Sequence, residues 1–266
     1  IPMNSHELDY VLHGDDMQLV EVTLDLGETV IAEAGAMNYM DDGVTFGARM
    51  GDGSSPNQGV MDKLFQVGKR VLTVSGVGSG GMIAGLTFRG GNGGTSKGGG
   101  ISVDFSSLTI TNCVIRNNVA NETNNRGAGI YVNRSVADIV ACTVQDNALS
   151  GNHPYGGGVS VEGSTVNMRD CVVASNSVSR GGAGIYHSGN GTLFNCLIVS
   201  NQCADATKGD GLHLSGSGIA LLNCSIVDNG GIGLLGDATM TNCIAWGNGN
   251  DLSGVSTSKL HFCCIE

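Results

Sequence analysis

The feature that most constrains this chain is a cysteine followed five residues later by an asparagine, a pattern that occurs six times. The six pairs are Cys113/Asn118, Cys142/Asn147, Cys171/Asn176, Cys196/Asn201, Cys224/Asn229 and Cys243/Asn248. Upstream of each cysteine a G-x-G block leads into an aliphatic residue, which precedes the cysteine by 12, 12, 12, 11, 12 and 9 positions. Self-similarity at a period of roughly 20 to 50 residues indicates a solenoid.

Within each copy, apolar residues alternate in three short bursts. In one copy these are Ile130 and Val132, then Ala137 and Ile139, then Cys142 and Val144. Alternation with a period of two indicates strands with one buried face. Three strands separated by corners describe one triangular coil, and stacked coils bury a continuous column of side chains. Leu86 marks a degenerate first copy and Cys264 the start of an eighth, so we predict about seven coils.

The segments GAGIYV, TNCVIRNN and FNCLIVSN resemble right-handed parallel β-helix repeats of the pectate-lyase-like superfold. The resemblance covers residues 74–266 and predicts an all-β fold, a right-handed parallel β-helix. It is unspecific for activity, because this fold supports many functions. Bacterial surface proteins and autotransporter passengers carry similar repeats, so the resemblance implies a secreted or cell-surface protein.

The first 72 residues differ in composition from the rest. They hold twelve acidic and four basic residues and no cysteine, whereas residues 73–266 hold twelve acidic and nine basic residues and all nine cysteines. This step predicts a domain boundary near residue 73. The motifs HGDDMQ, ETVIAEAGAM, YMDDG, GDGS and GKRVLT resemble the opening of the AIM24 family, a compact β-rich domain of which residues 3–73 form the first third.

Short-range patterns in this N-terminal segment predict its local structure. Alternation over residues 18–24 predicts a strand, and Val60, Leu64 and Val67 at helical spacing predict a short helix. A third of a domain cannot close a core of its own. We therefore expect residues 1–73 to form a short β-rich segment that caps the exposed end of the first coil.

The repeated cysteines and asparagines have structural interpretations. A thiol is a small apolar group suited to a stacked interior position, and asparagine suits corners because it tolerates left-handed backbone. No Cys-x-x-Cys pair exists, so no metal site is predicted. Cys203 in a loop and Cys263 beside Cys264 are the candidates for a free exposed thiol.

Most extra length lies between each asparagine and the next glycine block, so the insertions should project from one edge of the solenoid. Insertions on one face are where repeat proteins usually bind. The candidate ligand-binding residues in and beside them are Lys97, Arg126, Tyr131, Tyr155, Arg180, Tyr186, Lys208 and His213. Cations beside aromatic rings suit an anionic sugar chain. The same side chains are equally expected on an ordinary solvated surface.

Catalytic residues cannot be assigned from the sequence. The hydrolases of the superfold resemble one another through N-T-D, D-D and G-H-G motifs, which residues 74–266 lack, and a lyase needs carboxylates that hold calcium and a base. The aspartates of the repeats are scattered, and His187 occupies an inward position that valine or leucine holds in other copies. We therefore expect a buried core histidine and no cofactor, with calcium required only for a lyase.

These observations favour a non-catalytic secreted or cell-surface scaffold that binds polysaccharide along its loop-bearing edge. The alternatives are a polysaccharide lyase or glycoside hydrolase, and a chimeric or truncated chain with no function of its own. A net charge of −11 argues against nucleic acid as a partner, and no apolar run is long enough to predict a membrane span. The chain as given shows no signal-peptide pattern, and open coil ends would favour oligomerisation.

Overall fold

The computed structural model describes residues 9–13, 19–23, 71–93, 97–121, 126–151, 154–205, 207–216 and 218–266. The chain forms two compact units, residues 1–45 and 46–266. In the first unit, β1 (Asp9–His13) pairs antiparallel with β2 (Leu19–Thr23), which confirms the strand predicted over residues 18–24. The predicted helix over residues 60–67 lies outside the described residues, and the proposed capping role remains a prediction.

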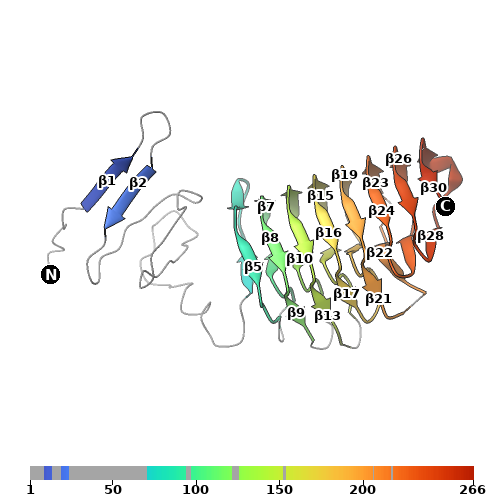
Figure 1. Cartoon of the computed structure of the whole chain (residues 1–266), viewed down its shortest axis with the longest axis horizontal. Coiled ribbons are helices and arrows are strands. Elements are labelled where there is room, and N and C mark those ends of the chain that lie inside the picture. Colours follow the sequence, from blue (N-terminus) through green and yellow to red (C-terminus); the bar gives the residue numbers. More distant parts are fainter. Residues whose placement is uncertain are drawn as a thin grey trace. The chain divides into compact units, whose positions relative to one another are not determined.

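The second unit is a β-solenoid with three parallel sheets of eight strands each (Figure 1). The first sheet holds β3 (Leu72–Ser75), β6 (Ile101–Asp104), β10 (Ile130–Asn133), β14 (Val159–Glu162), β18 (Ile185–His187), β22 (Gly209–Leu214), β25 (Ile232–Leu235) and β28 (Asn250–Ser253). The second holds β4 (Gly81–Ala84), β7 (Ser107–Thr111), β11 (Val136–Val140), β15 (Thr165–Arg169), β19 (Asn190–Phe194), β23 (Gly218–Leu222), β26 (Thr239–Thr241) and β29 (Leu260–His261).

The third sheet holds β5 (Thr87–Arg89), β8 (Val114–Arg116), β12 (Thr143–Gln145), β16 (Val172–Ala174), β20 (Leu197–Val199), β24 (Ser225–Val227), β27 (Ile244–Trp246) and β30 (Cys264–Ile265). Each coil contributes one strand to each sheet, as the three apolar bursts predict. Eight strands per sheet make eight coils where about seven were predicted, because the degenerate copy around Leu86 and the copy that ends in β30 both form complete triplets. A short 3₁₀ helix, η1 (Thr257–Lys259), precedes β29.

A fourth, four-stranded sheet lies in the insertions, where only loops were predicted. Its strands are β9 (Val119–Ala120), β13 (Ala148–Leu149), β17 (Ser177–Val178) and β21 (Gln202–Cys203), which lie side by side along one edge of the solenoid (Figure 1). Their inward residues form a second, smaller core with two alanines of the G-A-G blocks. Its members are Ala120, Ala128, Leu149, Val178, Ala183 and Cys203.

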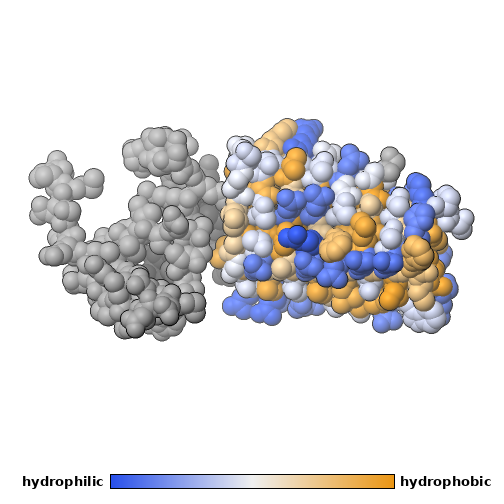
Figure 2. Space-filling view, turned by 90° about the horizontal axis from the view of Figure 1, so that it is seen from above, coloured by the Kyte–Doolittle hydropathy of each residue, from blue (hydrophilic) through white to orange (hydrophobic). Residues whose placement is uncertain are grey.

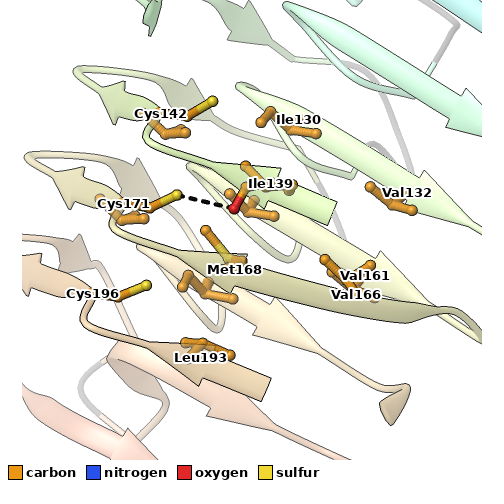
Figure 3. Close-up of a cluster of buried hydrophobic side chains, with 14 of the residues drawn as sticks. Ile130, Val132, Ile139, Cys142, Val161, Val166, Met168, Cys171, Leu193 and Cys196 are labelled. Atoms are coloured by element: carbon orange, nitrogen blue, oxygen red, sulfur yellow. Dashed lines mark hydrogen bonds between the residues drawn. The ribbon is translucent and has the colours of Figure 1, made fainter. Parts of the chain in front are cut away.

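The main core is a set of columns of apolar side chains that continue from coil to coil. Figure 3 shows parts of these columns: Ile130, Val132 and Val161 of the first sheet, Ile139, Met168 and Leu193 of the second, and Cys142, Cys171 and Cys196. Each cysteine of the column is 2% exposed or less and its thiol donates to the carbonyl two residues earlier. The Cys171 thiol also lies 3.3 Å from the Ile139 carbonyl of the preceding coil. All cysteines are unbridged, which fits a packing role.

The asparagines form a buried hydrogen-bonded ladder. The Asn147 amide group donates to the Asn176 side-chain oxygen at 2.9 Å and to the Ile115 carbonyl at 2.9 Å, and the next coil repeats the pattern with Asn176 and Asn201. The left-handed corner residues are their predecessors, among them Asn117, Asp146 and Ser175 with φ of 53–54°. The predicted corner role is therefore wrong by one position: the ladder residue satisfies buried backbone, and the residue before it turns the chain.

Two cysteines differ from the sequence interpretation. Cys203, expected as an exposed loop thiol, is 8% exposed within β21. Burial raises the pKa of its thiol. Cys263, rather than Cys264, continues the cysteine column. It precedes β30, and its thiol donates to the His261 carbonyl two residues earlier, as the other thiols of the column do. Cys264 is the exposed thiol.

Apolar residues also reach the solenoid surface among hydrophilic ones, as Figure 2 shows for one face. Phe105, Val136 and Phe194 are examples, with 40–54% of their area exposed. Among the described residues no helix is long and apolar enough to cross a membrane.

Candidate functional site

The predicted ligand-binding residues gather on the outer face of the first sheet, beside the insertions. We call this surface the loop-bearing face. Tyr131 of β10, Ser160 of β14, Tyr186 of β18 and His213 of β22 are direct neighbours in the parallel register. The insertions end beside them, and Arg126 and Tyr155 form a parallel bridge. The structure thus places these side chains along neighbouring strands, and their role in ligand binding stays a prediction.

The end of this row nearest β6 is internally paired around Glu162, the last residue of β14. One carboxylate oxygen of Glu162 accepts from Arg126 Nε at 2.6 Å and the other from the Tyr131 hydroxyl at 2.8 Å. Lys97 Nζ lies 3.6 Å from the same carboxylate and donates to Tyr131 at 3.1 Å. We call Lys97, Arg126, Tyr131 and Glu162 the paired half.

Hydrogen bonds, charge pairing and burial all engage the paired half within the protein. Burial of Glu162 works against ionisation, but the hydrogen bonds from Tyr131 and Arg126 hold the pKa of its carboxyl below the usual value. Burial, reinforced by Glu162, raises the pKa of Tyr131. Tyr131 is only 3% exposed. Its ring therefore cannot stack on a sugar, and the charge of Arg126 is already matched within the protein.

The middle of the row is a stack of rings. The Arg126 guanidinium lies 4.6 Å from the centroid of the Tyr155 ring, and the Tyr155 and Tyr186 rings are 4.7 Å apart. His213 meets the Tyr186 ring edge-on at 5.4 Å. Gly181, with φ of +72°, packs on Tyr155 so closely that a Cβ would come within 2.7 Å of the ring. Tyr155 is therefore largely a packing residue that joins the insertions to the sheet.

The end of the row at β18 and β22 is more open. Arg180 is exposed, Lys208 and Tyr186 are half-buried, and the Tyr186 hydroxyl is 3.0 Å from the Ser215 hydroxyl. Hydrogen bonds from Thr207 lower the pKa of Asp205, and Lys208 and Arg180 contribute to the same shift. Burial lowers the pKa of His213, with Lys208 as a further cause. We call Arg180, Tyr186, Lys208 and His213 the open half.

Sequence reasoning missed Glu162, the residue that divides the row. Its position carries a signal, because Asp104, Asn133 and Glu162 occupy one register column at the ends of β6, β10 and β14. All three side chains are partly exposed, and the Asn133 amide donates to Asp104 at 2.7 Å. A polar column next to a column of cations predicts ion pairing.

Two other titratable groups that could take part in a reaction are buried and held by hydrogen bonds of the fold. His187 is fully buried, its Nδ1 accepts from the Gly189 amide at 3.1 Å, and burial lowers its pKa to about 4. This agrees with the core histidine that the sequence indicates. Asp210 is 1% exposed, accepts from the Cys203 amide at 3.1 Å, and has its pKa raised by burial. Among the described residues no three histidine, cysteine or carboxylate groups cluster as metal ligands.

Comparison with known families gives two matches to separate parts of the chain. Residues 10–124 match the model of the AIM24 family, described as mitochondrial biogenesis AIM24, and residues 157–266 match the right-handed β-helix region. The AIM24 match continues beyond residue 73, through the strands β3 to β9, so the domain boundary near residue 73 remains a prediction. No curated protein and no solved structure matches the chain. The chain thus combines an AIM24-like N-terminal part with a right-handed parallel β-helix.

Proposed function

We propose that this protein is a non-catalytic secreted or cell-surface scaffold that binds acidic polysaccharide through the open half of its loop-bearing face. The observation that carries the proposal is the grouping of Arg180 and Lys208 beside Tyr186 and His213 on adjacent coils. Cations at the rim of a ring-lined surface can pair with uronate carboxylates while the rings contact the sugar faces.

The ion pairs and hydrogen bonds of the paired half reduce the number of residues that we propose to contact the ligand. Glu162 already neutralises Arg126 and covers Tyr131 together with Lys97, so these three contribute little to ligand affinity. Among the described residues, Asp205 is the carboxylate whose pKa Arg180 and Lys208 help to lower. A polyanion can therefore add charge pairs in the open half without first breaking a buried one.

The same geometry disfavours a lyase or hydrolase at the loop-bearing face. A general acid needs a carboxyl that is protonated near neutral pH, but the pKa of Glu162 is lowered. Asp210 has a raised pKa but is buried and receives a backbone hydrogen bond. We therefore propose binding without cleavage.

The test is retention of the 266-residue chain on immobilised uronate-rich and neutral glycans, with and without calcium. We expect retention on uronate-rich chains that falls at least tenfold in the double variant Arg180→Ala, Lys208→Ala. The matched control, Arg134→Ala with Arg169→Ala, removes two cations from other surfaces and should retain wild-type binding. No retention on any glycan, or equal loss in the control, would refute the proposed site. Shortened glycans after incubation would favour the enzyme instead.

A further inference from the structure

The outer face of the third sheet changes in character along the solenoid. We call this surface the third-sheet face. Its outward column runs from coil to coil as Arg89, Arg116, Gln145, Ala174, Val199, Val227 and Trp246. The parallel column two residues earlier runs from coil to coil as Val172, Leu197, Ser225 and Ile244. The face is thus cationic at β5 and β8 and mainly apolar from β16 to β27.

The apolar part is exposed to an extent that needs an explanation. Trp246 is 51% exposed, Ile244 44% and Leu197 36%. Phe194, at the adjoining end of β19, is 40% exposed. Single exposed apolar residues are ordinary, but a contiguous apolar patch with a polar rim marks an interaction site.

We propose that the third-sheet face binds a second copy of this chain, with the two solenoids antiparallel and related by a two-fold axis along β20. This surface is separate from the loop-bearing face, so the inference is independent of the proposed function. In such an isologous contact Val199 meets its own copy, and Ala174 meets Val227. These small side chains allow two sheets to approach to about 10 Å.

Charge complementarity favours a second copy of this chain as the partner and favours the antiparallel direction of the two solenoids. Glu266 lies beside Trp246, because its amide donates to the Ala245 carbonyl at 3.2 Å. One Glu266 carboxylate oxygen accepts from Gly247 at 2.9 Å, and the carboxylate carries the negative charge that a cation of the second copy would pair with. Arg116 and Glu266 are each three coils from β20, so antiparallel solenoids place them opposite each other.

The parallel arrangement would instead bring Arg89 and Arg116 of both copies to the same end. Like charges at an interface weaken binding strongly. The charge pattern therefore favours an antiparallel dimer over a parallel one.

The test is sedimentation velocity of the full chain over a range of protein concentrations. We expect a monomer–dimer equilibrium that Val199→Asp weakens about a hundredfold, because the substitution places two carboxylates together on the two-fold axis. The control, Ala220→Asp, adds the same charge on the outer face of β23 in the second sheet and should leave the equilibrium unchanged. Thermal unfolding of both variants reports on folding separately.

A charge exchange tests the direction. Arg116→Glu alone should weaken the dimer about tenfold, and the added Glu266→Arg should restore it. A monomer at every concentration would overturn the proposal, as would a dimer that Val199→Asp leaves intact. A dimer that Val199→Asp abolishes but the charge exchange does not restore would overturn the antiparallel arrangement.

Discussion

At the scale of single residues, the asparagine ladder concentrates hydrogen bonds in the interior. The Asn176 amide donates to the Val144 carbonyl and to Asn201, and its oxygen accepts from the amide and side chain of Asn147. Asn176→Ala leaves these buried partners unpaired, so we expect the free energy of unfolding to fall by about 3 kcal/mol or more. Urea denaturation measures it. The control Asn167→Ala, which breaks exposed hydrogen bonds to Asp138 and Thr192, should cost under about 0.5 kcal/mol.

His187 makes stability depend on pH. Burial lowers the pKa of His187 in the folded state to about 4 from its usual value of 6.5, so between these pH values the unfolded chain binds the extra proton. Stability should be full above about pH 6.5 and fall as the pH drops towards 4, by up to about 3 kcal/mol. Unfolding at pH 7.5 and pH 5 should show a smaller decrease for His187→Leu than for wild type. An equal decrease in both would contradict this assignment, and the exposed His261→Leu serves as control.

The residue scale also shows what the sequence could predict. The inward positions, including that of His187, follow from alternation alone, since every strand points alternate side chains into the core. The pairing of Glu162 with Arg126 and Tyr131 involves insertions whose path no repeat pattern describes. The columns of residues were therefore predictable, but the division of the loop-bearing face into a paired and an open half was not.

At the scale of elements, the fourth sheet ends at β21, and a side chain accepts the hydrogen bond that a further strand would accept at this edge. The Cys203 amide, which would donate to a following strand, donates to Asp210 at 3.1 Å. We expect Asp210→Ala to loosen this edge and to raise the rate at which a thiol reagent labels Cys203 about tenfold, measured by mass spectrometry of the peptide. Asp210→Asn keeps an oxygen acceptor, so the Cys203 thiol of this variant should be labelled slowly. The exposed Cys264 provides the internal reference, and an unchanged Cys203 rate in Asp210→Ala would contradict the capping role.

The same sheet explains a limit of the sequence analysis. Its strands contain two residues each, which is too short for alternation to be visible in one copy. A weak signal exists across copies, because the second residue after the asparagine is Ala120, Leu149, Val178 or Cys203, all small or apolar. Only alignment of the insertions with one another could have revealed it.

At the scale of the whole molecule, each coil packs only on its neighbours, so stability should vary along the solenoid. Strands β29 and β30 contain two residues each, and Phe262 between them is 90% exposed. We expect hydrogen exchange to be slowest in β11, β15 and β19 and fastest in β29 and β30, because neither of these two strands contains a buried residue.

A matched pair of core substitutions tests whether coils open independently. Met240 and Met168 are both buried in the second sheet, in β26 and β15 respectively. Met240→Ala should accelerate exchange mainly in β26 to β30, because β29 and β30 on that side of β26 contain no buried residue. Met168→Ala, with the same loss of about 2–5 kcal/mol, should accelerate exchange on both sides of β15, since opening there separates two blocks of coils. Equal acceleration throughout the solenoid in both variants would show that it unfolds as one cooperative unit instead.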